Sequence, residues 1–222
     1  MLADKILYFL RNLKIEASIP KGVDVLNPYR QPEAWELCTQ FYQKYYNDSE
    51  TRRLIIGINP GRFGGGLTGI PFTDPIRLQQ VCEIKNDLPK KPELSSEFIY
   101  KVIAAFGGAN QFFRNFYFTS VSPLGFTKEN KNLNYYDNLT LEKRLQPFMK
   151  ACMRAQLAWG LHTDIAFCLG EGANYKFLHA WNKEENFFKE IIPLPHPRFV
   201  MQYKRKQLDS YVTHYLDKLS DR

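Results

Sequence analysis

The sequence has few cysteines, and they lack the paired spacing that a metal site or cluster needs. Cys38, Cys82, Cys152 and Cys168 are scattered along the chain with no CxxC pair. This pattern argues against a structural zinc site and against an iron–sulfur cluster. We expect four buried, reduced thiols, no metal and no cofactor.

The sequence also lacks a long apolar run and a recognisable signal sequence. No hydrophobic segment approaches the length of a membrane-spanning helix. The first six residues include an acidic residue, Asp4, and predict an amphipathic helix instead of a signal peptide. We therefore expect a soluble, cytoplasmic protein with no membrane partner.

The length and charge of the chain indicate how many domains it has and what kind of partner it binds. With 222 residues, of which 44% are hydrophobic, the chain can bury one substantial core, so we expect a single domain over residues 1–222 and a monomer. The 30 Lys and Arg residues outnumber the 23 Asp and Glu residues, which gives a net charge of +7. This excess favours a polyanionic partner such as DNA, but many soluble proteins are modestly basic, so charge alone is a weak indication.

Strand and helix patterns alternate along the chain. Short segments rich in β-branched or aromatic residues, each followed by Gly or Pro, predict strands at 54–58, 116–121, 164–169 and 191–194. Apolar residues at helical spacing predict helices at 6–13, 32–46, 96–105, 145–159, 173–181 and 204–219. This alternation predicts an α/β fold with three α/β/α layers and a short, mainly parallel, four-stranded central sheet.

The four predicted strands end in polar or glycine-rich segments. In open α/β sheets, ligands bind beyond the carboxyl ends of the strands, so we expect these segments to meet at one rim. They are Asn59 with the glycines after it, residues 120–125, residues 170–172 and residues 195–198. For 170–172 we expect an ordinary helix start, where Glu171 lies favourably at the positive end of the helix.

The segment 54–72 is the most informative part of the sequence, because an apolar strand leads into a loop with five glycines. Glycines tolerate positive φ and leave room for a ligand against the backbone. The loop also contains one amide, Asn59, and one aromatic residue, Phe72, which suit a flat polar ring. No GxxxxGK[ST] run occurs in it, so a P-loop for nucleotide phosphates is disfavoured.

This loop resembles the first motif of the uracil-DNA glycosylase superfamily, and specifically of its single-strand-selective monofunctional branch. The resemblance extends from about residue 25 to residue 219 and is strongest at this motif. It implies a glycosylase that removes a damaged base from DNA in base excision repair. The residues in register with the motif are Gly57, Asn59, Pro60, Gly61, Phe63, Gly64, Thr68, Gly69, Pro71 and Phe72.

The resemblance implies roles for the loop residues. Asn59 would position the attacking water, and an amide does this by orientation because it is a weak base. Phe72 would stack on an extruded base, although a core aromatic residue is the alternative. We expect Gly57, Ile58 and Gly61 to contact the base closely.

The second motif departs from the family pattern His-Pro-Ser-Pro-Arg, in which the His donates to the uracil carbonyl. Here the family's His position holds Leu194, and a histidine, His196, follows two residues later. We hypothesise that His196 takes over the donor role. The alternatives are that His196 contacts phosphate or lies in a surface turn between prolines.

The base-edge position also departs from the family, because Ser120 replaces an asparagine there. A hydroxyl is shorter and less selective than an amide. The sequence therefore supports removal of a deaminated base, with uracil first, and leaves xanthine, hypoxanthine and oxidised pyrimidines open. Glu33 could help to bind water or base, but a solvated carboxylate at a helix start is the better interpretation.

Basic and bulky residues alternate after the second motif. We predict that Arg198, Lys204 and Arg205, with Pro197 and with Arg62 from the glycine loop, contact DNA phosphates. Phe199, Met201 and Tyr203 lie between these basic residues and suit a wedge in the DNA stack. The alternative is that 204–206 is simply a solvated helix start.

Two other functions stay open on sequence grounds. One is a catalytically silent binder of damaged or single-stranded DNA, which would keep the pocket without excision. The other is a hydrolase of free nucleosides or nucleotides, which would not need the basic segment. Neither motif contains a lysine that could form a Schiff base, so a monofunctional enzyme is expected.

Overall fold

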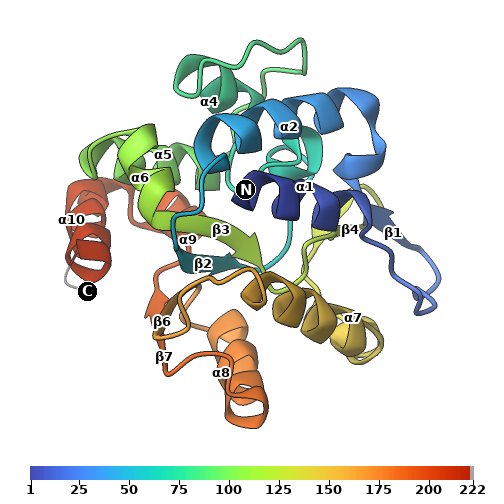
Figure 1. Ribbon diagram of the computed structural model, residues 1–222. Coiled ribbons are helices and arrows are strands. Elements are labelled where there is room, and N and C mark those ends of the chain that lie inside the picture. Colours follow the sequence, from blue (N-terminus) through green and yellow to red (C-terminus); the bar gives the residue numbers. More distant parts are fainter. Residues whose placement is uncertain (221–222) are drawn as a thin grey trace.

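A computed structural model describes residues 1–220 and shows a parallel sheet between layers of helices (Figure 1). All neighbouring strands of the four-stranded sheet run parallel, in the order β3-β2-β6-β7. The predicted fold class is therefore confirmed, and the predicted strands overlap the observed ones closely. The strands are β2 (Arg53–Gly57), β3 (Phe116–Ser120), β6 (Ile165–Leu169) and β7 (Glu190–Leu194).

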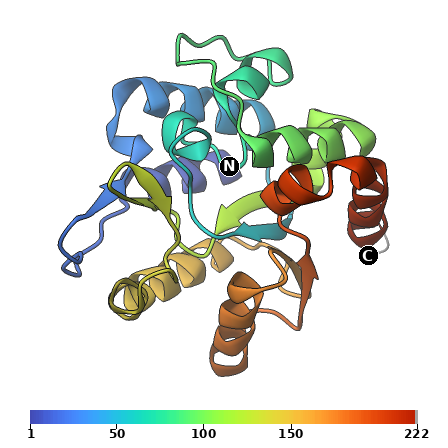
Figure 2. The same ribbon diagram turned by 180° about the vertical axis from the view of Figure 1, so that it is seen from behind.

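Helices connect the strands and cover both faces of the sheet, as Figures 1 and 2 show from opposite sides. Helix α2 coincides with its predicted range, whereas others differ at their ends. The described helices are α1 (Leu2–Arg11), α2 (Pro32–Tyr46), α3 (Gly65–Thr68), α4 (Pro75–Gln80), α5 (Leu94–Ala105), α6 (Ala109–Asn115), α7 (Leu139–Leu157), α8 (Ala173–Glu185), α9 (Pro197–Tyr203) and α10 (Leu208–Ser220), with short 3₁₀ turns at Pro28–Arg30 and Arg205–Gln207.

Side chains of strand β3 contact the helices on both faces of the sheet. Its residues alternate between the two faces of the sheet. On one face Phe118 stacks on Phe112 of α6, with ring centroids 5.5 Å apart. On the other face the Thr119 hydroxyl donates a 2.7 Å hydrogen bond to Gln156 of α7. Both faces are covered, which is why β2, β3 and β6 are almost entirely apolar and buried.

The chain order places a switch point at the centre of the sheet. From β2 the chain moves outward to β3 on one side, and then crosses back to β6 on the other side of β2. Connections to neighbouring parallel strands are right-handed, so the helices before β3 and those after it cover opposite faces. The connections that leave the carboxyl ends of β2 and β6 lead in opposite directions, toward β3 and β7, and such points are where open sheets bind ligands.

A second, antiparallel sheet of three strands was not predicted. Strand β1 (Val23–Leu26) pairs with β4 (Gly125–Lys128), which forms a hairpin with β5 (Lys131–Leu133). The two turn residues, Glu129 and Asn130, both have positive φ values, as a tight type I′ hairpin turn requires. The hairpin carries the chain from β3 to the wall of the cavity described below.

The C-terminal segment also differs from the predicted single helix at 204–219. Helix α9 begins at Pro197, because the side chain of His196 caps it and Pro197 fits its first turn. It ends at Tyr203, and α10 begins after a short turn at Leu208. The basic residues Lys204 and Arg205 therefore lie at a break between helices.

All four cysteines are free and buried, as expected. Within residues 1–220, no helix is long and apolar enough to cross a membrane.

Candidate active site

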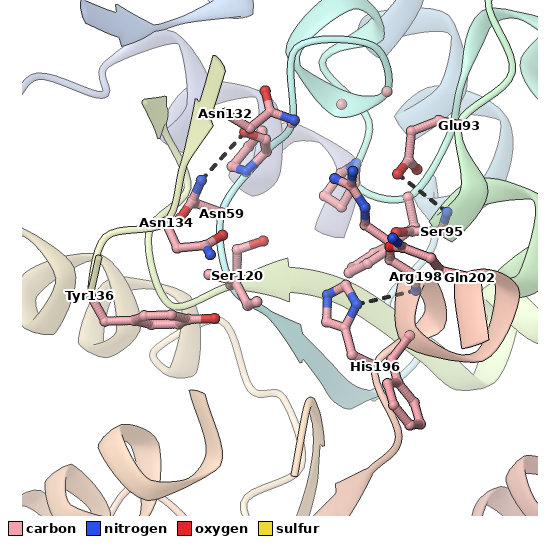
Figure 3. Close-up of a pocket in the computed structure, with 18 of the residues that line it drawn as sticks. Asn59, Glu93, Ser95, Ser120, Asn132, Asn134, Tyr136, His196, Arg198 and Gln202 are labelled. Carbon is pink, nitrogen blue, oxygen red and sulfur yellow. Dashed lines mark hydrogen bonds between the residues drawn. The ribbon is translucent and has the colours of Figure 1, made fainter. Parts of the chain in front are cut away.

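A cavity of about 420 Å³ opens where strands β2, β3 and β7 end (Figure 3). One wall comes from the glycine loop after β2, a second from the hairpin segment after β5, and a third from α9 with the start of α5. The lining residues are Ile58, Asn59, Pro60, Gly61, Gly64, Gly65, Pro71, Phe72, Glu93, Ser95, Ser120, Asn132, Asn134, Tyr136, His196, Arg198, Phe199, Gln202 and Tyr203.

The glycine loop folds tightly on itself. The Gly66 N–H donates a 2.9 Å hydrogen bond to the Gly61 carbonyl oxygen. A Cβ atom on residue 66 would lie 2.7 Å from that oxygen, so a larger residue would force the turn open. The glycines at these two positions therefore serve the path of the loop itself.

Phe72 has an unusual backbone conformation for a bulky residue, with φ at +54°. Such a conformation costs of order 1–3 kcal/mol and persists only where the surroundings impose it. The ring packs directly over Gly57, because a Cβ atom on residue 57 would lie 2.6 Å from the ring's Cζ atom. Phe118 supports the ring at a centroid distance of 5.3 Å. Gly57 thus lies behind Phe72 and is not part of the lining.

The Asn59 side chain joins the glycine loop to the hairpin segment. Its Nδ2 donates to the Leu133 carbonyl oxygen at 3.2 Å, and its Oδ1 accepts from the Tyr135 N–H at 3.0 Å. The amide donates one hydrogen bond to the hairpin segment and accepts one from it, as a backbone peptide does in a β-sheet. These two bonds fix the distance between the glycine loop and the hairpin segment. A carboxamide oxygen has two lone pairs, which leaves Oδ1 able to accept one more hydrogen bond from a water molecule.

His196 follows β7, and its ring points into the cavity that Ser120 and Arg198 also line (Figure 3). Its Nδ1 accepts a hydrogen bond from the Arg198 backbone N–H at 3.2 Å. Burial, with a smaller contribution from the Arg198 charge, lowers the pKa of His196 to about 4. The imidazole is therefore neutral near pH 7 and carries its proton on Nε2, which faces the centre of the cavity.

The other residues that we predicted to contact the base line the cavity, whereas the family's histidine position does not. Ser120, at the end of β3, is 5% exposed and lines the cavity, and Ile58 and Gly61 also line it. Leu194 is fully buried at the end of β7, where it pairs with Leu169. The family's histidine position is therefore a core position in this chain, and His196 is the histidine that reaches the cavity.

The predicted DNA contacts lie mostly outside the cavity, and two require correction. Arg198 is exposed and lines the cavity. Arg62 stacks on the neighbouring Phe63 ring at 4.3 Å, and Arg205 pairs with Glu97 at 3.2 Å. Pro197 is buried as the first residue of α9, so its side chain does not face solvent.

The prediction that Met201 is part of a wedge in the DNA stack is also wrong, since this side chain is only 3% exposed and packs into the core. By contrast, Phe199 is 41% exposed and Tyr203 is 66% exposed. These two rings lie at the cavity mouth, 5.7 Å apart.

Two other expectations concern residues away from the cavity. Glu33 lies exposed in the first turn of α2 and does not line the cavity, which fits a helix-start carboxylate. Gly172 caps the start of α8, as expected of an ordinary helix start. Gly170 nevertheless reaches the site indirectly, because a Cβ atom there would lie 3.8 Å from the His196 ring.

Sequence reasoning missed six polar lining residues. Glu93 caps α5 through hydrogen bonds from the Ser95 and Ser96 N–H groups, so its carboxylate is held at the rim. Burial raises the pKa of Tyr136 to about 12, so its hydroxyl stays protonated. The only available signal was the tight hairpin turn, which brings residues 132–136 to the cavity. The six are Glu93, Ser95, Asn132, Asn134, Tyr136 and Gln202.

The comparisons with known proteins agree with this geometry. The family model for the uracil DNA glycosylase superfamily matches residues 43–220. The crystal structure of wild-type SMUG2 from Pedobacter heparinus is 46% identical in sequence and superposes with a TM-score of 0.96. That match covers 99% of this chain and 97% of the other. No curated protein matches. The resemblance predicted from the glycine loop is confirmed: the chain belongs to the uracil DNA glycosylase superfamily and is a DNA N-glycosylase.

Proposed function

We propose that this enzyme hydrolyses the N-glycosidic bond of a uracil nucleotide that has rotated out of DNA into the cavity. The observation that carries the proposal is the neutral His196, whose Nε2–H faces the same cavity as the Phe72 ring. An aromatic face suits an unstacked base, and a fixed N–H donor suits the negative charge that develops on a departing base.

The proposed reaction is a displacement by water. The bond between the sugar C1′ and the base nitrogen breaks through an oxocarbenium-like sugar, and the base leaves as an anion. His196 donates a hydrogen bond to that anion through Nε2. Asn59 Oδ1 accepts a hydrogen bond from the attacking water and orients it, the water oxygen bonds to C1′, and the proton that this water loses passes to solvent. Since the Asn59 amide is already fixed by the hairpin, this orientation costs little further ordering.

The cavity mouth supplies the proposed DNA contacts. Arg198 lines the cavity, Arg62 and Lys204 each follow a lining residue in the chain, and the net charge of +7 favours a polyanion. The exposed rings of Phe199 and Tyr203 suit a wedge that fills the gap left by the rotated base. We expect Arg205 to contribute less, because it pairs with Glu97.

Excision can be tested on single-stranded and duplex oligonucleotides that carry uracil, hypoxanthine or xanthine. We expect strand breaks at uracil after alkali treatment, which cleaves the abasic product. Binding to these oligonucleotides without any strand break would refute the proposal and support a silent DNA binder.

The proposed enzyme is monofunctional, because none of the cavity-lining residues is a lysine. We expect no strand cleavage before alkali treatment and no covalent adduct with borohydride. The same assays separate DNA from free nucleosides as substrates. Binding through several phosphates weakens steeply with salt, whereas turnover of a free nucleoside would respond little.

A further inference from the structure

The amide side chains in and around the cavity wall 132–136 differ in whether they have hydrogen-bond partners. Asn59, in the glycine loop, hydrogen-bonds to the backbone of this wall at Leu133 and Tyr135, on both sides of residue 134. The Asn132 Oδ1 accepts a hydrogen bond from the Arg62 N–H at 3.1 Å. Both of these side chains therefore have structural partners.

Asn134 differs, because its backbone is fixed while its side chain is not engaged. Its N–H donates to the Asp137 carboxylate at 2.8 Å, and its carbonyl oxygen accepts from the Asp137 N–H at 3.0 Å. Within residues 1–220, neither polar atom of its carboxamide has a hydrogen-bond partner in the protein. Figure 3 shows this carboxamide directed into the cavity, which Ser120 also lines.

A deaminated base presents a ring N–H next to a carbonyl oxygen. Recognition of this edge requires an acceptor and a donor side by side, which a primary amide supplies in one group. Ser120 has only a hydroxyl at the corresponding end of β3. Within residues 1–220, the other cavity-lining amide without a hydrogen-bond partner is Gln202, which lies exposed on α9.

We propose that Asn134 is the residue that recognises the base edge in this enzyme. Its Oδ1 accepts the ring N–H and its Nδ2 donates to the adjacent carbonyl oxygen of the base. This inference rests on the proposed function and adds the substrate class, which is a base with an N–H/C=O edge. The recognition amide thus comes from the hairpin segment instead of from the end of β3.

The test measures binding, so that it does not depend on catalysis. Single-stranded oligonucleotides carry a 2′-fluorinated nucleotide, because the fluorine destabilises a cation-like sugar and prevents hydrolysis. The base is either uracil or 2-pyrimidinone, which lacks the N3 proton and the O4 atom of uracil. Fluorescence anisotropy gives Kd for the wild type, Asn134→Ala, Asn134→Asp and the control Asn110→Ala, an exposed asparagine on α6.

We expect the wild type and Asn110→Ala to bind the uracil oligonucleotide more tightly than the 2-pyrimidinone one. Asn134→Ala should weaken uracil binding about 10- to 100-fold and 2-pyrimidinone binding little, so that the preference disappears. Asn134→Asp keeps the size of the side chain but loses the donor, and should also lose the preference. Thermal melting checks that each variant is folded.

An unchanged preference in folded Asn134→Ala would overturn the inference, as would an equal loss of affinity for both bases. The proposed function fails in a different way. If the wild type discriminates between the two bases but never excises uracil from the unfluorinated oligonucleotide, Asn134 keeps its role and the glycosylase reaction is refuted.

Discussion

Burial gives His196 a protonation state that its sequence position leaves open. The sequence indicated only a histidine between two prolines. In the folded chain its Nδ1 accepts the Arg198 N–H, so only Nε2 can carry the proton of the neutral ring. A charged imidazole would lose that hydrogen bond and would lie buried beside an arginine.

Replacing His196 therefore has a defined expected effect. We expect His196→Ala to slow uracil excision by about 10²- to 10³-fold, the usual cost of losing one donor to a developing anion. Single-turnover rates at saturating enzyme measure this change. Full activity in a folded His196→Ala variant would reduce the residue to its capping role in α9.

The lowered pKa also predicts the pH dependence. The pKa falls from 6.5 to about 4, so the unfolded chain binds more protons than the folded chain between these values. Stability from this site is therefore full above about pH 6.5 and is lost as the pH falls toward 4. We expect urea unfolding to show a smaller loss between pH 7 and pH 5 in His196→Gln than in the wild type. The excision rate should show no step near pH 6.5 from this histidine.

Gly57 provides a residue-scale test of the stacking position. A methyl group at residue 57 would lie 2.6 Å from Phe72 Cζ, so Gly57→Ala must displace the ring. A displacement of about 1 Å near reacting groups can cost about 10²-fold in rate, and we expect a loss of that order in excision. Thermal melting checks that Gly57→Ala is folded. Wild-type activity in the folded variant would argue against stacking on Phe72.

At the scale of elements, the antiparallel hairpin depends on Asn59 for its position. We expect Asn59→Ala to abolish most excision and to lower the free energy of unfolding by only about 1–3 kcal/mol, because two hydrogen bonds are lost. Hydrogen exchange at the Tyr135 amide should become faster, while exchange in the parallel sheet stays slow. Normal exchange at Tyr135 with lost excision would assign Asn59 to water alone.

The elements also separate what sequence reasoning could predict from what it could not. The parallel strands are apolar runs followed by Gly or Pro, and they were found. Strands β4 and β5 have four and three residues, too few for a periodic pattern, and Lys128 to Lys131 are polar. The residues that were missed in the cavity wall, including Asn134 and Tyr136, follow this hairpin. Motif residues were found because their signal is local.

For the whole molecule, one buried arginine holds several segments together. Arg52 is 0% exposed, and its guanidinium donates to both Asp48 carboxylate oxygens at 2.7 Å. It also donates to the carbonyl oxygens of Tyr45, Glu50 and Phe113. The end of α2, the start of β2 and α6 thus share one charged group.

Removing this group should destabilise the whole fold. We expect Arg52→Met to lower the free energy of unfolding by about 1–3 kcal/mol, because three carbonyl groups lose a buried donor, while the partly exposed Asp48 carboxylate can turn to water. Urea unfolding measures the change, and Lys14→Met, which breaks an exposed pair with Glu16, should change stability little. The hydrogen bonds from Arg52 lower the pKa of Asp48, so this stabilisation is present above about pH 4 and is lost in stronger acid. A neutral effect of Arg52→Met would contradict this account.

The four buried thiols have a practical consequence for watching the enzyme on DNA. Burial raises the pKa of Cys38, Cys152 and Cys168 to about 12 and also raises that of Cys82, so none is a thiolate at neutral pH. Maleimide dyes react with thiolates that they can reach. A cysteine introduced at the exposed position of Tyr203 would therefore be labelled selectively in the otherwise natural chain. A fluorophore at the cavity mouth could then report each encounter with a lesion in real time.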